Sequence, residues 1–487
     1  MSSGRRTAGE ARRAAGQATA AQYAELRKWA VDALGVFRRY PEVGLLAALL
    51  LLTSIFSREF SKGASIGPIY VTEVVMVLST GIALHRQGVR RSWALLQRVP
   101  LLPLALIWVV GAIATLRGLS EFSRSFVEND IGLVDYTLLL PILALLAVDR
   151  ERFTALYTTL VACGFAGIAT FFVTYAADQV TGEANTLFTL QGSAAGLYMS
   201  LAVIWVAARL VNGVPTSWWL KAVIPVGLVM MGLTTQRSVW MIAIVSLAIV
   251  GLFSPRPRLR TGIAIVAVLI AGLAGAIAIQ AGLNATVGGV SGTGGDGDNF
   301  ATTSEGGGTQ LGQELSGLGG IAGGEGDAAA ESENVSWRLA YWKELLSRVP
   351  DRPVLGAGFG EPAAFFWDDR KYDFRDGRPG SGIDVAGPHN SFVNFVYRLG
   401  IPAFLALMFV IFVALRNAFR AVRGGGIERA DRVALSTLVG MLAAGAMASS
   451  FNEGLTGPFL GLFFWVPLGM LLLWPFTRGR ESAPAAR

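Results

Sequence analysis

The chain has 487 residues, of which 53% are hydrophobic and 15% charged, and its mean hydropathy is +0.50. These values exclude an ordinary soluble protein, in which about 25% of residues are charged. The net charge of +7 does not come from a folded basic domain, so it does not favour nucleic-acid binding.

Several segments are apolar over roughly the 20 residues that a helix needs to cross a bilayer. The twelve segments lie at residues 42–57, 68–85, 100–117, 131–148, 153–177, 190–211, 217–234, 237–253, 260–282, 396–416, 432–451 and 456–476. Their continuous apolar runs lack the alternation of a membrane β-barrel. The sequence therefore predicts an all-α polytopic membrane protein with twelve transmembrane helices.

The basic residues predict the orientation of these helices, because Lys and Arg resist translocation when they lie near the ends of a span. With a cytoplasmic N-terminus, 27 of the 41 basic residues lie on the cytoplasmic side. Of the other 14, 9 fall in the single long loop between the ninth and tenth segments, where the rule has little force. We therefore expect both termini in the cytoplasm and the loop of residues 283–399 on the outer side.

The long loop has two unlike parts. Residues 282–330 contain 17 glycines and no Lys or Arg, so they bury too little surface to become ordered. The chain is thus predicted to divide into a basic cytoplasmic segment (1–41), helices 1–9 (42–282), a flexible glycine-rich loop (283–331), an ordered extracytoplasmic loop (332–395), helices 10–12 (396–476) and a cytoplasmic tail (477–487).

Arg237 lies at the predicted start of the eighth helix. Thr234 or Thr235 can cap this helix, which leaves Arg237 in its first turn. A fixed positive charge then coincides with unpaired backbone N–H groups, and this combination predicts an anion site.

A helix at the membrane surface is predicted within the ordered part of the loop, with Ser332 or Asn334 as its N-cap. Its apolar residues at helical spacing are Val335, Leu339, Trp342, Leu346 and Val349. Arg338 is expected to share a face with Tyr341, Trp342 and Leu345.

Gly356 and Gly358 belong to a glycine-rich turn that allows the backbone to approach a ligand closely. The turn meets neither the dinucleotide nor the phosphate-loop pattern. The aromatic residues that follow within 361–387 fit stacking on sugar rings and plain packing equally well.

His389 is one of two histidines and directly precedes the tenth segment, with Pro388 suited to the first turn of the helix and Asn390 beside it. The positive end of the helix dipole is expected to lower the pKa of the imidazole and favour its neutral form, which can act as a base. From position alone, a surface histidine without a role fits as well.

Three features converge on the predicted outer face. Two guanidinium groups, Arg237 and Arg338, suit a pyrophosphate, and a neutral imidazole at His389 suits deprotonation of a hydroxyl. We therefore predict His389, Arg338 and Arg237 as catalytic residues of sugar transfer from a lipid pyrophosphate. The predicted substrate-binding residues are Asn390, Gly356, Gly358, Tyr341 and Trp342. No metal site is predicted, because His85 lies on the inner side, far from His389.

At four motifs the sequence resembles the O-antigen ligase and polymerase superfamily of bacterial membrane glycosyltransferases. The motifs are TQRS (235–238), WRLAYW (337–342), PVLGAGFG (353–360) and HNSF (389–392), the last ahead of Leu399-Gly400. The chain departs from the family pattern in its glycine-rich insertion and at Gln236 and Trp337.

The resemblance implies a GT-C-like, metal-independent and inverting transferase of the bacterial inner membrane that needs no cofactor. Its partners would be a glycan donor on undecaprenyl pyrophosphate and a lipid or glycan acceptor whose hydroxyl attacks at the outer leaflet. Arg237 and Arg338 would bind the pyrophosphate, and His389 would take or orient the acceptor proton. The oligomeric state stays open.

Three alternatives remain at this point. The first is a polysaccharide repeat-unit polymerase of the same superfamily. The second is a transporter or flippase of a lipid-linked glycan or small solute, although the sequence has no clear internal repeat. The third is a different polyprenyl-phosphate transferase whose base is a carboxylate of the earlier outer loop: Glu121, Glu128 or Asp130.

Overall fold

The computed structural model describes most of the chain. The described residues are 8–63, 65–66, 69–122, 124–181, 192–234, 237–253, 328–361, 365–367, 370–372, 388–424, 426–452 and 454–478. The predicted ninth span (260–282) and nearly all of the glycine-rich loop lie outside them.

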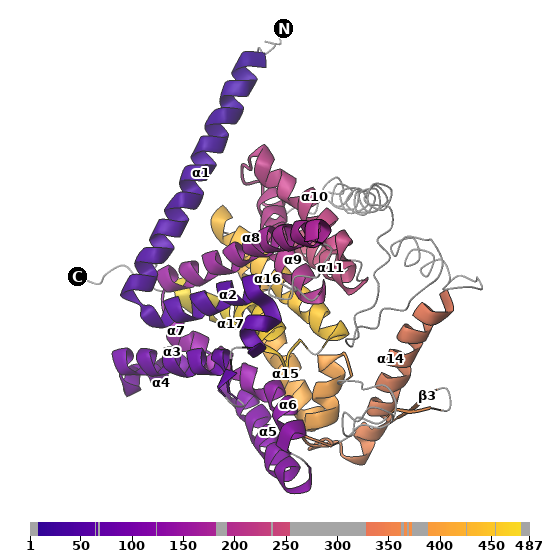
Figure 1. Ribbon diagram of the computed structural model, residues 1–487. Coiled ribbons are helices and arrows are strands. Elements are labelled where there is room, and N and C mark those ends of the chain that lie inside the picture. The colour runs from indigo at the N-terminus through magenta and orange to yellow at the C-terminus, as the bar shows by residue number, and fades with distance from the viewer. Residues whose placement is uncertain are drawn as a thin grey trace.

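Helices make up nearly all of the described structure (Figure 1). Those of the first half are α1 (Ala8–Arg39), α2 (Pro41–Gly63), α3 (Val71–Gln87), α4 (Val89–Leu96), α5 (Leu101–Glu121), α6 (Arg124–Asp135), α7 (Leu139–Leu146), α8 (Arg150–Thr181), α9 (Gly192–Val211), α10 (Trp218–Leu233) and α11 (Arg237–Leu252). Those of the second half are α14 (Ala328–Arg348), α15 (Ser391–Arg423), α16 (Arg429–Phe451) and α17 (Pro458–Arg478).

Seven helices of the described part are long and apolar enough to cross a membrane. They span Leu101–Glu121, Phe126–Leu146, Arg150–Ala177, Ala194–Val211, Ser391–Arg423, Arg429–Phe451 and Pro458–Thr477. Shorter apolar helices cover three further predicted spans, at Pro41–Ser57, Trp218–Leu233 and Ser238–Leu252. The prediction of a helical polytopic membrane protein is thus confirmed, while the count of twelve stays a prediction.

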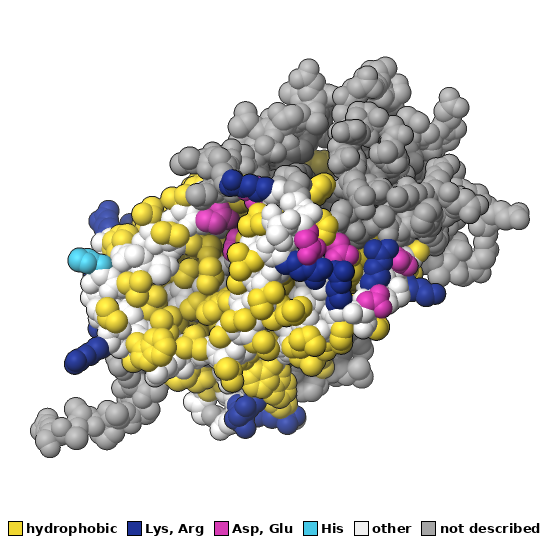
Figure 2. Space-filling view, turned by 90° about the horizontal axis from the view of Figure 1, so that it is seen from below, with side chains coloured by type: hydrophobic (Ala, Val, Ile, Leu, Met, Phe, Trp, Pro, Cys, Tyr) yellow, Lys and Arg dark blue, Asp and Glu magenta, His cyan; other side chains and the backbone are white. Residues whose placement is uncertain are grey.

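Figure 1 shows α14 at one edge of the molecule and the C-terminal end of α1 at the opposite edge. Helices α9, α16 and α17 lie in the interior, where Trp205, Trp465 and Phe463 have no exposed surface. Apolar side chains cover much of the face in Figure 2, and charged side chains gather toward its edges. A lipid-facing apolar surface with polar ends is what a membrane-spanning body requires.

Strands are confined to two short antiparallel pairs among the described residues. The first pairs β1 (Ser65–Ile66) with β2 (Ile69–Tyr70). The second pairs β3 (Phe365–Trp367) with β4 (Arg370–Tyr372), with Phe365 opposite Tyr372. The second pair falls in the aromatic stretch that follows the glycine-rich turn.

Two helix starts differ from the sequence prediction. Helix α14 begins at Ala328 and not after a cap at Ser332 or Asn334, because the alanines at 328–330 favour helix and extend it backwards. Helix α15 begins at Ser391, five residues before the predicted 396, because its first turns are too polar for a hydropathy criterion but are capped by Asn390.

Candidate active site

His389 lies immediately before the capped start of α15. The side-chain oxygen of Asn390 accepts hydrogen bonds from the backbone N–H groups of Phe392 and Val393, at 3.0 and 3.1 Å. These bonds satisfy two of the N–H groups that a helix start leaves unpaired. Pro388 therefore precedes the helix, and its predicted place in the first turn is wrong.

The backbone of His389 adopts a φ of 48°, in the left-handed region that residues with a side chain rarely occupy. Such a conformation costs about 1–3 kcal/mol and persists only where the surroundings enforce it. One such constraint is visible directly before it, where the indole N–H of Trp342 donates to the carbonyl oxygen of Pro388 at 2.6 Å. Helix α14 thus holds the segment that carries the imidazole.

The face of α14 that packs on the body is the one predicted for Arg338, Tyr341, Trp342 and Leu345. Tyr341 and Leu345 are each 1% exposed. By contrast, Leu339 and Leu346 of the predicted apolar spacing are 54% and 45% exposed. Exposed leucines on a surface helix are the type of residue that contacts lipid.

Arg338 and His389 are electrostatically coupled. The pKa of His389 is lowered to about 4, first by burial and then by the positive charge of Arg338. The predicted direction is therefore confirmed, and the causes are burial and a neighbouring guanidinium. The pair keeps the imidazole neutral at physiological pH.

The guanidinium of Arg338 is itself partly desolvated, and burial lowers its pKa from the usual value. Its Nε is buried, and no residue of the described part accepts a hydrogen bond from it. No carboxylate among those residues lies at ion-pair distance either. A buried guanidinium with unused donor capacity is suited to bind an anion.

Helix α15 is interrupted at Gly400, which has a φ of 78°. Residues 353–360, hereafter the strap, lie across this break. The N–H groups of Ala357 and Gly358 donate to the carbonyl oxygens of Tyr397 and Arg398, at 2.8 and 3.1 Å, and the N–H of Ile401 donates to Pro353 at 2.8 Å. The strap thereby satisfies the backbone groups that the break would leave unpaired.

Of the two glycines of the strap that were predicted to approach a ligand, Gly356 approaches the protein itself. Gly356 has a φ of 65°, and a Cβ there would lie 2.5 Å from the carbonyl carbon of Arg398. Gly358 has a φ of 90°. The close contact at Gly356 and the positive φ of both glycines give a structural reason for them, while substrate binding by either stays a prediction.

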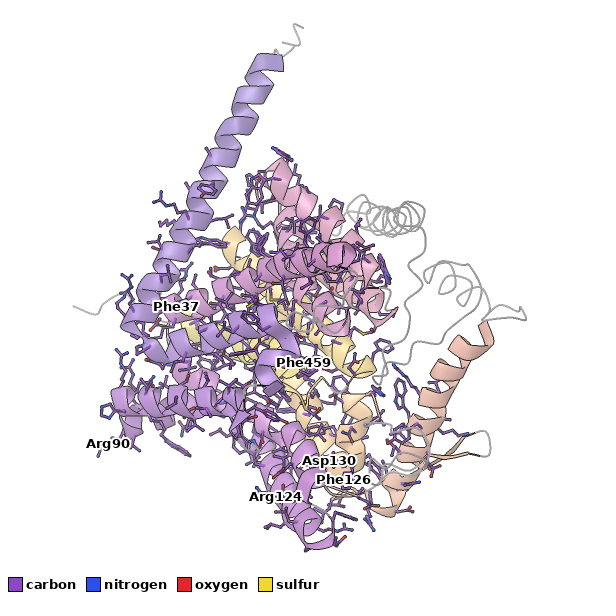
Figure 3. All side chains as sticks on the ribbon, in the orientation of Figure 1. Phe37, Arg90, Arg124, Phe126, Asp130 and Phe459 are labelled. Carbon is purple, nitrogen blue, oxygen red and sulfur yellow. The ribbon has the colours of Figure 1, made fainter. Side chains whose placement is uncertain are left out.

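An ion pair between Asp130 and Arg398 anchors the other end of the strap. The Oδ2 of Asp130 lies 3.2 Å from the Nε of Arg398, and both side chains are 12% exposed. The same oxygen accepts the N–H of Gly360 at 2.8 Å, and Arg398 donates to the carbonyl oxygen of Glu361 at 2.6 Å. Figure 3 shows Asp130 at the end of the molecule where α5, α6 and α15 meet.

The sequence did not reveal this positioning pair, because 268 positions separate its members and no short motif links them. The contact also bears on the three carboxylates considered as an alternative base. Asp130 pairs with Arg398, while Glu121 and Glu128 pair with arginines four residues earlier, Arg117 and Arg124. Each of these three carboxylates is therefore already engaged by a guanidinium group.

Arg237 is the first residue of α11, as predicted, and its side chain lies outside the described residues. Thr234 does not cap α11. It ends α10, and its hydroxyl donates to the carbonyl oxygen of Met231 at 2.7 Å. The structure therefore brings together two of the three predicted catalytic residues, Arg338 and His389.

No group of three or more His, Cys, Asp and Glu residues that could hold a metal ion occurs within the described ranges. Metal independence stays a prediction.

A comparison with known families finds a match in the middle of the chain. Residues 222–408 match the family described as O-antigen ligase. The matched region runs from α10 into α15 and includes Arg237, Arg338, the strap and His389. No protein of curated function matches the chain. The resemblance stated from the motifs is thus confirmed for this region.

Proposed function

Since residues 222–408 carry the signature of the O-antigen ligase family, we propose that this membrane protein is a glycosyltransferase of the ligase type. It would move a glycan from undecaprenyl pyrophosphate to an acceptor hydroxyl at the outer leaflet of the bacterial inner membrane, with both termini in the cytoplasm. The reaction is metal-independent and inverts the anomeric centre.

The observation that carries the proposal is the neutral imidazole of His389 next to Arg338. An imidazole whose pKa is lowered to about 4 is unprotonated at neutral pH and can accept a proton. The adjacent guanidinium has a buried Nε that no described residue uses as a donor. A base that is electrostatically coupled to an anion-binding group suits attack on a glycosyl pyrophosphate.

The proposed step begins when the acceptor hydroxyl transfers its proton to His389. Its oxygen then forms a bond to the anomeric carbon on the face opposite to the pyrophosphate. The bond between that carbon and the pyrophosphate oxygen breaks, and the electron pair leaves with the pyrophosphate. Arg338, together with Arg237, stabilises the charge that develops on the leaving group.

The test uses the full-length protein in lipid nanodiscs with a labelled undecaprenyl-pyrophosphate glycan and a set of acceptors. His389→Ala should lower kcat at least about 100-fold, because general-base catalysis contributes typically 10²–10⁴-fold. Arg338→Ala should cause a loss of similar size through the leaving group, and Arg338→Lys a smaller one. Lys343→Ala, an exposed change on the same helix, is the matched control.

Three outcomes would reject this proposal. Full turnover by His389→Ala together with loss in Glu128→Gln would favour a carboxylate base. Uptake of a solute into proteoliposomes without any glycan transfer would favour a transporter. Transfer only onto another lipid-linked repeat unit would keep the chemistry but identify a polymerase.

A further inference from the structure

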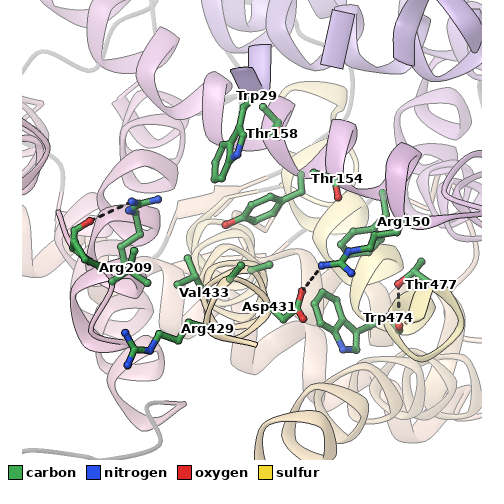
Figure 4. Close-up of a pocket in the computed structure, with 16 residues that line it drawn as sticks. Trp29, Arg150, Thr154, Thr158, Arg209, Arg429, Asp431, Val433, Trp474 and Thr477 are labelled. Carbon is green, nitrogen blue, oxygen red and sulfur yellow. Dashed lines mark hydrogen bonds and ion pairs between the residues drawn. The ribbon is translucent and has the colours of Figure 1, made fainter. Parts of the chain in front are cut away.

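The described part of the chain contains a cavity of about 360 Å³ that the proposed reaction does not use (Figure 4). It is lined by side chains from five helices: Trp29 of α1, Arg150 of α8, Arg209 of α9, Arg429 of α16 and Trp474 of α17. Its volume falls in the range of ligand sites.

The cavity and His389 lie at opposite ends of α16. Arg429, the first residue of α16, lines the cavity. At the other end of the helix, the carbonyl oxygen of Asn452 accepts a hydrogen bond from the hydroxyl of Ser391 at 3.1 Å. Ser391 lies two residues after His389 in the chain. Because α16 has 23 residues, the two places are about 35 Å apart, roughly the thickness of a bilayer. The cavity thus lies at the end that the basic residues predict to be cytoplasmic.

The charged side chains of the cavity wall are three arginines and one aspartate. Arg150 lies 3.8 Å from Asp431 and 3.5 Å from Glu428, so its charge is largely offset. Arg209 donates to the carbonyl oxygen of Pro215 at 3.3 Å and lies over the ring of Trp205. For Arg429, no carboxylate of the described residues lies at ion-pair distance. The wall therefore keeps a net positive charge, which suits an anion.

The start of α16 adds to this charge. Glu428 is its N-cap residue but makes no side-chain capping hydrogen bond. Asp431 is the acidic residue of the first turn and lies at ion-pair distance from Arg150. The partial positive charge of the first backbone N–H groups adds to the charge of Arg429. Figure 4 shows Arg209 and Arg429 on the same side of the cavity, with Arg150 and Asp431 on the other.

Much of the remaining wall is apolar and aromatic, with Trp29, Phe153, Val433 and Trp474. A small soluble anion gains nothing from such walls, whereas an amphipathic molecule places its phosphate near the arginines and its acyl chains against the rings. Basic pockets between helices at the cytoplasmic surface bind anionic headgroups for this reason. Tryptophan also favours the boundary between headgroups and chains.

We propose that this cavity binds an anionic phospholipid of the leaflet on its own side of the membrane, with the lipid phosphate held by Arg209 and Arg429. The site is separate from the proposed active site and does not depend on the transferase assignment. Bound lipid would connect α1, α8, α9, α16 and α17, which contribute its walls.

The experiment measures lipid retention by native mass spectrometry on the full-length protein, released from nanodiscs of phosphatidylglycerol or phosphatidylcholine. The wild-type protein should retain phosphatidylglycerol and not phosphatidylcholine. Arg429→Gln should weaken retention about five-fold, the effect of one arginine near an anionic surface. Arg420→Gln, an exposed change on α15 that does not line the cavity, should leave retention unchanged.

A second variant tests the cavity without altering charge. Ala430 lines the cavity and is exposed, so Ala430→Trp should fill the space and reduce retention while the protein stays folded. Equal retention of both lipids, or equal retention by Arg429→Gln and Arg420→Gln, would overturn the proposal. So would thermal stabilisation by inorganic phosphate alone without retained lipid, because the ligand would then be a soluble anion.

Discussion

At the scale of single residues, the reactivity proposed for His389 depends on its surroundings and not on its place in the chain. Burial and the charge of Arg338 both disfavour the imidazolium ion, so the pKa of the imidazole is lowered from about 6.5 to about 4. Trp342 fixes the carbonyl group directly before it. In the proposed reaction, the same guanidinium would therefore tune the base and bind the leaving group.

This coupling predicts how His389 titrates. The unfolded chain binds a proton near pH 6.5 but the folded chain only near pH 4, so the folded protein should lose stability as the pH falls through this range. The base should stay neutral down to about pH 4. Because the chain has two histidines, His85→Asn leaves one imidazole for NMR titration. In this background Arg338→Gln should raise the measured pKa.

The prediction has a clear failing outcome. A midpoint near 6.5 in the otherwise native protein, unchanged by Arg338→Gln, would show that the imidazole is neither buried nor coupled to the guanidinium. The acidic limb of the transfer rate should follow the same midpoint, because the neutral imidazole is the reactive form.

At this scale the sequence identified which residues carry the chemistry, but it did not reveal the contacts that hold them in place. Arg338 and His389 stand in short motifs, so their convergence could be predicted. The left-handed backbone of His389 and the ion pair of Asp130 with Arg398 could not, because both depend on contacts between distant segments. Periodicity carries information about faces of one helix and none about partners elsewhere.

At the scale of elements, the strap and the break in α15 form one unit. Gly356 and Gly400 both have positive φ, and a Cβ on either would lie within 2.7 Å of the other segment. Neither position accepts a side chain without movement of backbone. The motif at 353–360 is predicted from the sequence to be a turn that approaches a ligand. In the structure its role is to satisfy the backbone groups at the break in α15.

Gly356→Ala should therefore destabilise the protein strongly. The added methyl group meets backbone at 2.5 Å, and the left-handed conformation adds a further cost of about 1 kcal/mol. We expect the thermal midpoint to fall by several degrees, as a loss of a few kcal/mol produces. The matched control is Gly81→Ala in α3, where nothing lies within 4 Å of the added group. An equal midpoint in the two variants would contradict the role given to the strap.

The helix boundaries show where a hydropathy criterion fails. The start of α15 carries Ser391, Asn394 and Arg398 among its apolar residues, and the apolar run was therefore expected to begin later. The decisive local signal was the cap residue Asn390, whose side chain closes the first turn. For α14, two acceptable cap residues lie inside a helix that begins earlier, because capping preference is weaker than the helix propensity of an alanine run.

At the scale of the whole molecule, the structure places two functional candidates at opposite ends of the spanning helices. The composition and the twelve apolar segments were sufficient to predict the helical membrane class. They could not predict which helices are interior, because a span buried among other helices and one facing lipid have similar hydropathy. The interior position of α9 and α16 emerges only from packing.

The predicted orientation can be tested with single cysteines. The native Cys163 is buried in α8, so Cys163→Ala provides the background. In intact cells, Lys343→Cys on α14 should react with a membrane-impermeant maleimide. Arg420→Cys at the far end of α15 should react only after the membrane is opened. The reverse pattern would place His389 on the cytoplasmic side and exclude transfer at the outer leaflet.

The interruption of α15 at Gly400 has a mechanical consequence. In an unbroken helix each residue is rotated by about 100° about the helix axis relative to the one before it. The direction in which a residue at the N-terminal end points therefore depends on the position and rotation of the whole remaining helix. Here the helix is interrupted at Gly400, and hydrogen bonds from the strap fix the orientation of the segment before the break. The long segment of α15 after Gly400 can then tilt to match the thickness of the surrounding bilayer. Such a tilt does not rotate the imidazole of His389 away from the guanidinium of Arg338.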